Sequence, residues 1–266
     1  MNDSFLNHKE PEEIFLPLSE EQYAEFYSME MDHFTEDIEF YKNQCGKHSS
    51  ILELGCGTGR ISRALTSYGC SVLSLDLSFA MLQQAKSHTG ERLSCVCMDM
   101  TAMAFRKKFD HIIIPYNTLN LLRSPALIAK CLQQTRTLLK PSATLLLQLH
   151  IPDLQSKQVD DGKHFQFQIF PLQKESGKLI KETLRHHLPE GKEIHLEERY
   201  RLRPMKTPGK PMNFRHTQRL AGFSLEQWLT LFDKNGFQKV SLFSDYNLQP
   251  FQMGKDSILL IKASCS

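Results

Sequence analysis

The sequence predicts an α/β fold: a seven-stranded, mostly parallel sheet with helices on both faces and an antiparallel β insertion after the fifth strand. Short apolar runs alternate with helical periodicity from about residue 50 to 150. From about residue 160 to 220 the apolar period changes to two, which is typical of antiparallel hairpins. After residue 220 the pattern returns to a helix and two strands, so the insertion interrupts one α/β domain.

The composition indicates a soluble globular protein. The 266 residues are 41% hydrophobic and 23% charged, and the net charge is +2. A balance so close to neutral argues against the whole molecule being a polyanion binder. The sequence has no apolar run of membrane-spanning length and no basic-then-apolar N-terminus. We therefore expect a cytoplasmic protein that does not insert into membranes.

The seven cysteines predict neither disulfides nor a metal site. They are odd in number and scattered, mostly within apolar segments. Cys95 and Cys97 are separated by one residue, which is the wrong spacing for a zinc or redox pair. We expect reduced thiols in the core and no bound metal.

The N-terminal region divides into an arm and a helical layer. Residues 1–18 contain two prolines and several acids, and we expect a loose arm there. Ser19 and Gln22 have the spacing of a helix capping box. Aromatic residues then recur at helical spacing, which predicts a helical layer over residues 19–45.

A glycine-rich turn follows the first buried strand, residues 51–54. Gly55, Gly57 and Gly59 occupy alternate positions, and a helix starts at Ile61. Glycine lets a ligand approach the backbone, and the helix N-terminus offers free amide groups. A dinucleotide fingerprint would need glycine where Arg60 stands, and no P-loop lysine is present. The spacing therefore favours a different nucleoside ligand.

Two carboxylates mark the ends of the next two predicted strands. Asp76 ends the strand at 71–75, about 20 residues after the glycines, where a carboxylate can bind ribose hydroxyls. Ser78 can cap the helix that follows. Asp99 follows the strand predicted at 93–98. Because parallel strands end at one edge of a sheet, these acids belong on the same edge as the glycines.

The pattern Glu53-x-Gly55-x-Gly57-x-Gly59, together with residues 76–82, resembles the first two motifs of class I S-adenosylmethionine-dependent methyltransferases. The resemblance implies a Rossmann-like fold, S-adenosylmethionine as cofactor and S-adenosylhomocysteine as product. Tyr27 either closes over the cofactor, as an N-terminal tyrosine does in that family, or only packs in the helical layer. The cofactor-binding residues that we expect are Tyr27, Glu53, Gly55, Cys56, Gly57, Gly59, Asp76, Leu77, Met81, Asp99, Met100 and Asn117.

The fourth and fifth predicted strands, 109–114 and 144–149, place further polar residues at the same edge. Tyr116 and Asn117 follow the fourth strand, and Asn117 can hold either cofactor or substrate. His150 follows the fifth strand. It is either a base or a histidine with a structural role.

The insertion, residues 160–220, is expected to form a lid over the substrate. Apolar residues alternate with polar ones, as in Phe165, Phe167 and Ile169. From 160 to 222 it has thirteen Lys and Arg against eight Asp and Glu. Such a surplus suits either phosphate contacts or a solvated face. The main domain, 19–159, resumes at 221–266, with Ser224 and Gln227 as a second capping box.

The resemblance is strongest to small-molecule N- or O-methyltransferases that carry a β insertion. The reaction is an in-line displacement that depends mainly on alignment and water exclusion, so the sequence identifies no catalytic residue. The substrate-binding candidates are Tyr116, His150, His216 and Tyr246. An RNA or protein methyltransferase that uses the basic insertion and a non-catalytic cofactor-binding module are the alternatives.

Overall fold

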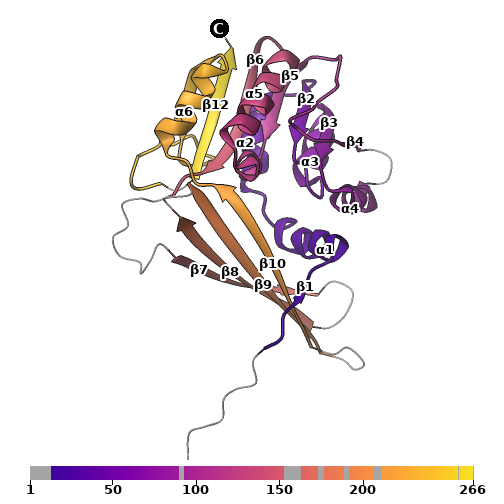
Figure 1. Ribbon diagram of the computed structural model, residues 1–266. Coiled ribbons are helices and arrows are strands. Elements are labelled where there is room, and N and C mark those ends of the chain that lie inside the picture. The colour runs from indigo at the N-terminus through magenta and orange to yellow at the C-terminus, as the bar shows by residue number, and fades with distance from the viewer. Residues whose placement is uncertain are drawn as a thin grey trace, which may run out of the picture.

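The computed structural model describes residues 13–89, 93–152, 163–172, 177–188, 192–205, 211–256 and 258–265. It has the predicted α/β architecture, with two sheets (Figure 1). No helix in these ranges is both long and apolar enough to cross a bilayer. The boundary expected at residues 159 and 160 lies outside the described residues.

The larger sheet has seven strands and is mostly parallel. Five neighbouring strands run parallel, and the two C-terminal strands add an antiparallel pair at one edge. In spatial order the strands are β11 (Phe237–Phe243), β12 (Ile258–Cys265), β6 (Leu139–His150), β5 (Phe109–Ile114), β2 (Ser50–Leu54), β3 (Ser71–Asp76) and β4 (Ser94–Cys97). From β2, the strands that follow in the chain are placed first on one side (β3, β4) and then on the other (β5, β6), so the order reverses at β2. Ligands of open α/β sheets bind at such a reversal, outside the ends of the strands, and a ligand is expected there.

Helices cover both faces of this sheet. Alternate residues of β2 point to opposite sides: Ile51 packs with α2 and α3, and Leu52 belongs to the core that includes Trp228 of α6. Burial on both sides explains why the strand reads as a continuous apolar run. The helices are α1 (Glu20–Met31), α2 (Glu36–Cys45), α3 (Arg60–Tyr68), α4 (Phe79–Thr89), α5 (Pro125–Leu138), α6 (Leu225–Lys234) and the 3-10 helix η2 (Thr118–Leu122).

The predicted helix starts agree with the structure at both capping boxes. Ser19 and Gln22 cap α1, and Ser224 and Gln227 cap α6, with both hydrogen bonds of each box formed. The predicted return to helix at residue 220 is wrong by a few positions. Strand β10 continues to Ala221 because it pairs with β9 to that point, so α6 begins only after Ser224.

The insertion forms the second sheet. Its strands are β7 (Lys163–Pro171), β8 (Gly177–Leu188), β9 (Glu193–Pro204) and β10 (Met212–Ala221), all antiparallel, with β1 (Leu16–Pro17) parallel to β10. Figure 1 shows this sheet beyond the ends of the larger one, with α1 between them. Residues 1–12 lie outside the described part of the chain. Residues 13–18 differ from the expected loose arm, because β1 pairs with β10 and Glu13 bonds Arg201.

In β7 the alternating apolar side chains point outward and the polar side chains between them point inward, which is the reverse of the usual arrangement. Phe165, Phe167 and Ile169 are exposed, although they gave the strand its apolar period. Their polar neighbours Gln166 and Gln168 instead line an internal cavity. The inner face of the second sheet is therefore partly polar where it borders the cavity.

All seven cysteines are free thiols. Four of them, Cys45, Cys56, Cys70 and Cys131, are buried, as expected for core thiols. Cys97 is exposed at the end of β4, which was not expected. No described group of His, Cys, Asp and Glu has the arrangement of a metal site.

Candidate functional site

The glycine turn after β2 needs glycine for conformation and for space. Gly55, Gly57 and Gly59 have φ values of +69°, +53° and +75°. Side chains rarely adopt this left-handed region. A Cβ on Gly55 would overlap the side chain of Thr118, and one on Gly57 would lie 3.3 Å from the ring of Tyr27. The turn thus packs closely against the segment after β5 on one side and helix α1 on the other.

Asp76 at the end of β3 organises the neighbouring backbone. Its carboxylate accepts hydrogen bonds from the amides of Gly57 at 2.7 Å and Ser78 at 2.9 Å. Burial, the largest effect, raises the pKa of Asp76, and the backbone bonds oppose it. The Ser78 hydroxyl accepts the amide of Met81 at 3.3 Å and so caps α4 as predicted. One carboxylate therefore fixes the glycine turn while it lines the cavity.

The end of β4 adds a second acid to this edge. Asp99 accepts a hydrogen bond from the Thr101 amide at 2.7 Å, and both Asp99 and Met100 line the cavity. Gly55, Gly57 and Asp76 line the same cavity from the two neighbouring strands. The structure thus brings together the glycines and both acids, as their places at the strand ends predicted.

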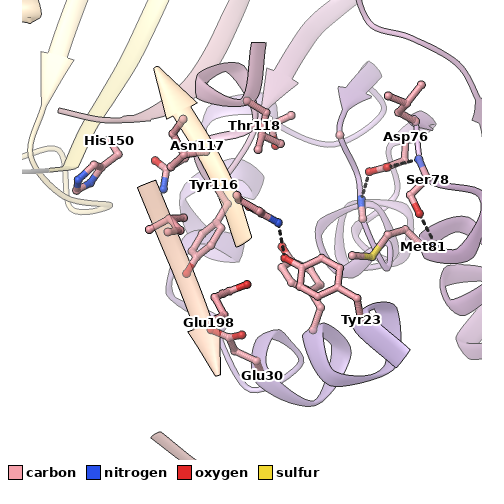
Figure 2. A pocket seen from close by; sticks show the side chains of 18 of the residues that line it. Tyr23, Glu30, Asp76, Ser78, Met81, Tyr116, Asn117, Thr118, His150 and Glu198 are labelled. Carbon is pink, nitrogen blue, oxygen red and sulfur yellow. Dashed lines mark hydrogen bonds between the residues drawn. The ribbon is translucent and has the colours of Figure 1, made fainter. Parts of the chain in front are cut away.

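The cavity has a volume of about 460 Å³ and lies between the strand ends, α1 and the inner face of the second sheet. Figure 2 shows Asp76, Ser78 and Met81 on one side and Glu30, Glu198 and Tyr116 on another. The predicted site residues that line it are Tyr27, Gly55, Gly57, Asp76, Leu77, Met81, Asp99, Met100, Tyr116, Asn117 and His150. This size and mixture of polar and apolar groups suit a small organic ligand.

The backbone after β5 is strained where it meets the cavity. Tyr116 and Asn117 have φ values of +48° and +62°. Such conformations cost about 1–3 kcal/mol each and cluster at functional sites. The Asn117 Oδ1 is buried and has no hydrogen-bond partner among the described residues. Since a buried acceptor without a partner is costly, this oxygen is available to a hydrogen-bond donor.

Asn120 joins the two sheets at this point, although no sequence pattern predicted it. Its amide nitrogen donates to the carbonyls of His150 at 3.0 Å and Ala221 at 2.8 Å. Its Oδ1 accepts the His150 amide at 3.2 Å. Asn120 is fully buried, so its side chain fixes the end of β6 against the end of β10.

Five predicted site residues do not line the cavity: Glu53, Cys56, Gly59, His216 and Tyr246. Tyr246 donates a hydrogen bond to Gln148 at 2.6 Å and lies 6.0 Å from Phe34, between ring centroids. His216 stacks on Tyr23, with the rings 4.0 Å apart. These positions give no support for direct ligand contact, but His216 belongs to a charge network that reaches the cavity.

That network was missed by the sequence analysis. Lys181 of β8 bonds two carboxylates, the partly buried Glu30 of α1 at 2.5 Å and the buried Glu198 of β9 at 2.6 Å. His216 Nδ1 lies 3.1 Å from Glu198. Glu30, Lys181 and Glu198 all line the cavity. The available signal was on α1, where Tyr23, Tyr27 and Glu30 recur at helical spacing on one face.

Glu53 lies under the glycine turn, where it accepts a hydrogen bond from Ser62. It is 2% exposed, and burial raises its pKa from 4.5 to about 7. The unfolded chain loses this proton near pH 4.5, whereas the folded protein keeps it to about pH 7. Folding stability attributable to Glu53 is therefore greatest below pH 4.5 and falls as the pH rises towards 7.

We expect Glu53→Gln to stabilise the protein relative to the wild type at pH 8 but not at pH 4.5. The shift from 4.5 to about 7 corresponds to at most about 3 kcal/mol. Urea unfolding at both pH values measures the difference, with the exposed Glu39→Gln as a control. An equal effect of Glu53→Gln at the two pH values would contradict the assignment.

Comparisons with known proteins give matches to the region around the glycine turn. Residues 51–142 match the family model described as "Methyltransferase domain". The chain is 32% identical over 122 residues to the putative methyltransferase YqeM of Bacillus subtilis (strain 168), covering 45% of this chain and 48% of that protein. It is 34% identical over 67 residues to the malonyl-[acyl-carrier protein] O-methyltransferase of Priestia megaterium, covering 24% of each. The matched region is thus less than half the length of either relative.

Solved structures match over more of the chain. An S-adenosylmethionine-dependent methyltransferase from Clostridium acetobutylicum matches with a TM-score of 0.73 at 13% identity, over 92% of this chain and 98% of that one. The sugar N-methyltransferase KedS8 from Streptoalloteichus matches with a TM-score of 0.70 at 16% identity, over 96% and 97%. The glycopeptide N-methyltransferase MtfA, solved with S-adenosylmethionine, gives 0.57 at 20% identity, over 86% of each. At these identities the matches show the fold alone.

Proposed function

We propose that this chain, which carries a class I methyltransferase domain with residues 51–142 at its centre, transfers a methyl group from S-adenosylmethionine to a nitrogen or oxygen atom of a small molecule. The observation that carries the proposal is the joint lining of one cavity by Gly55, Gly57, Asp76 and Asp99. The same cavity continues to the polar wall formed by the second sheet.

The residues present fit the cofactor. A Cβ at Gly57 would lie 3.3 Å from the ring of Tyr27, so glycine lets Tyr27 pack closely on the turn, and both residues line the cavity. The carboxylates of Asp76 and Asp99 can accept hydrogen bonds from ribose hydroxyls and from an adenine amino group. The unpartnered Asn117 Oδ1 can accept one from the amino-acid part of the cofactor. Tyr27 would pack against the bound molecule from α1.

When bound, the cofactor supplies a methyl group already activated by the positive sulfur. The protein then needs to align a nucleophile with that methyl group and to exclude water. Tyr27 and Tyr116 both line the cavity, although 37% of Tyr116 is exposed, and desolvation raises the pKa of each phenol. They remain neutral and can donate hydrogen bonds at neutral pH.

A small molecule suits this cavity better than a macromolecule does. The volume of about 460 Å³ must accommodate both cofactor and acceptor. Several of the insertion's basic side chains are paired on the outer face: Arg199 with Glu197, and Arg201 with Glu13 and Glu182. Paired guanidiniums offer little to a phosphate backbone, so the basic surplus is better explained as a solvated surface.

The test has two steps. Calorimetry with S-adenosylmethionine measures cofactor binding, and incubation of a metabolite extract with methyl-labelled cofactor shows by mass spectrometry what gains the label. We expect binding together with label in a compound of low molecular weight. Label in RNA or protein would contradict the substrate class, and binding without any transfer would indicate a non-catalytic module.

A further inference from the structure

Four charged or titratable side chains form a chain of contacts that ends in the cavity. His216 contacts Glu198, Glu198 contacts Lys181, and Lys181 contacts Glu30, with separations of 3.1, 2.6 and 2.5 Å. The residues come from β10, β9, β8 and α1. The cofactor-binding acids at the strand ends are not part of this chain, and the cofactor chemistry does not require it.

The buried Lys181 carries the positive charge in the middle of this series of contacts and is not itself a base. Burial opposes its charge, but the Glu198 and Glu30 carboxylates raise the pKa of the ammonium above its usual value. Lys181 therefore stays protonated and donates to both acids. Its side chain is only 5% exposed, which leaves it little freedom to reach a ligand.

The two carboxylates differ in environment. Glu198 receives contacts from both Lys181 and His216, and although burial acts against its charge, these contacts lower its pKa. Glu30 accepts a hydrogen bond from Lys181 on Oε2. Burial is the largest effect on Glu30 and raises its pKa. A pair of carboxylates with opposite shifts is typical of one fixed anion and one proton acceptor.

The position of Glu30 suits proton acceptance. It lies one turn after Tyr27 on α1, and Tyr27 packs on Gly57. In Figure 2 the Tyr116 side chain extends towards Glu198 and Glu30, and both acids raise the pKa of Tyr116. Arg185 also lines the cavity and lowers the pKa of Glu30. Glu30 is thus between the cofactor-binding end of α1 and the wall of the second sheet.

We infer that Glu30 is a catalytic residue that accepts a proton from an ammonium group of the substrate, so that the methyl acceptor is an amine. This inference depends on the proposed function. An alkylammonium group has a pKa near that of lysine, about 10.4, whereas an alcohol resembles water, about 15.7. A carboxylate pairs with an ammonium and can take its proton before the nitrogen attacks, whereas an alcohol gives up its proton only as its oxygen attacks. The Glu30 carboxylate therefore suits an amine better than an alcohol.

The ammonium gives a proton to the Glu30 carboxylate, and the freed nitrogen lone pair forms a bond to the methyl carbon. The bond from that carbon to sulfur breaks, and its electron pair stays on sulfur. The product is a methylated ammonium with S-adenosylhomocysteine, and Glu30 later releases its proton to solvent.

The test compares methyl transfer to matched amines and alcohols, D-glucosamine with D-glucose and cyclohexylamine with cyclohexanol, alongside the metabolite extract. We expect label on nitrogen and none on oxygen. Glu30→Gln should lower kcat by about 10²–10⁴-fold, with cofactor affinity changed less than about threefold, and Glu30→Asp should restore part of the rate. The control is Glu39→Gln, on the exposed face of α2, which should leave the rate unchanged.

Two readouts separate proton acceptance from a structural role. In the wild type kcat should fall as the pH drops through the raised pKa of Glu30, and in Glu30→Gln the acidic limb should move up to the pKa of the substrate ammonium. Binding of cyclohexylammonium, followed by calorimetry, should weaken at least about tenfold in the same variant. Label on oxygen, or a Glu30→Gln rate within threefold of wild type, overturns the inference alone. Cofactor binding without any labelled product overturns the proposed function with it.

Discussion

Replacing Asp76 with alanine is expected to weaken the binding of S-adenosylmethionine at least about tenfold. A hydrogen bond to a charged group contributes about 1.5–3 kcal/mol, which corresponds to roughly 10- to 150-fold in affinity. In addition, Asp76 accepts the amides of Gly57 and Ser78, so its loss also loosens the turn that holds the ligand. Calorimetric titration of the variant measures the change.

Two matched variants separate these effects. Ser78→Ala removes the cap of α4 but keeps the carboxylate, so its affinity should stay close to that of the wild type. Asp76→Asn keeps one acceptor oxygen, and its affinity should lie between those of the wild type and the alanine variant. If Asp76→Ala binds the cofactor as tightly as the wild type, Asp76 does not bind the ribose.

Replacing Asp37 with alanine is expected to destabilise the protein by about 3–5 kcal/mol, because it leaves the buried charge of Arg60 without its partner. The pair is bidentate, with both N···O distances at 2.6 Å. The side chains of Arg60 and Asp37 are only 9% and 1% exposed. Urea unfolding with a two-state fit gives the difference in the free energy of unfolding.

The double variant Asp37→Ala with Arg60→Met is the control. Removing both charges should recover a large part of the lost stability, since the cost comes from the unpaired guanidinium. If Arg60→Met lowers the free energy of unfolding of the Asp37→Ala variant by as much as it lowers that of the wild type, the two side chains are not coupled.

Arg60 also shows what the sequence could and could not predict about the site. The sequence excluded a dinucleotide fingerprint because Arg60 replaces a glycine. It did not show that this arginine would bond Asp37 and the Phe34 carbonyl across 23 and 26 residues. Contacts between distant segments depend on the packed fold, and local patterns do not encode them. The link joins the helical layer to the glycine turn.

The same distinction holds for the rest of the cavity. Asp76 and Asp99 were predictable because strand ends of a parallel sheet share one edge. Glu30, Lys181 and Glu198 were not, because they meet only when α1 packs against the second sheet. The period of two in the insertion predicted strands, but it did not predict which face would turn inward. In β7 the polar face does so, because it borders the cavity.

Asn120 has a consequence for how ligands enter. Its amide donates to His150, which ends β6 of the larger sheet, and to Ala221, which ends β10 of the second sheet. Swinging the second sheet away would therefore break the bond to Ala221 and leave that carbonyl without its fully buried partner. Asn120 thus holds the two sheets together at one corner, and any hinge motion that opens the cavity must turn about that corner. Substrate and product would then enter and leave on the opposite side of the cavity, next to α1.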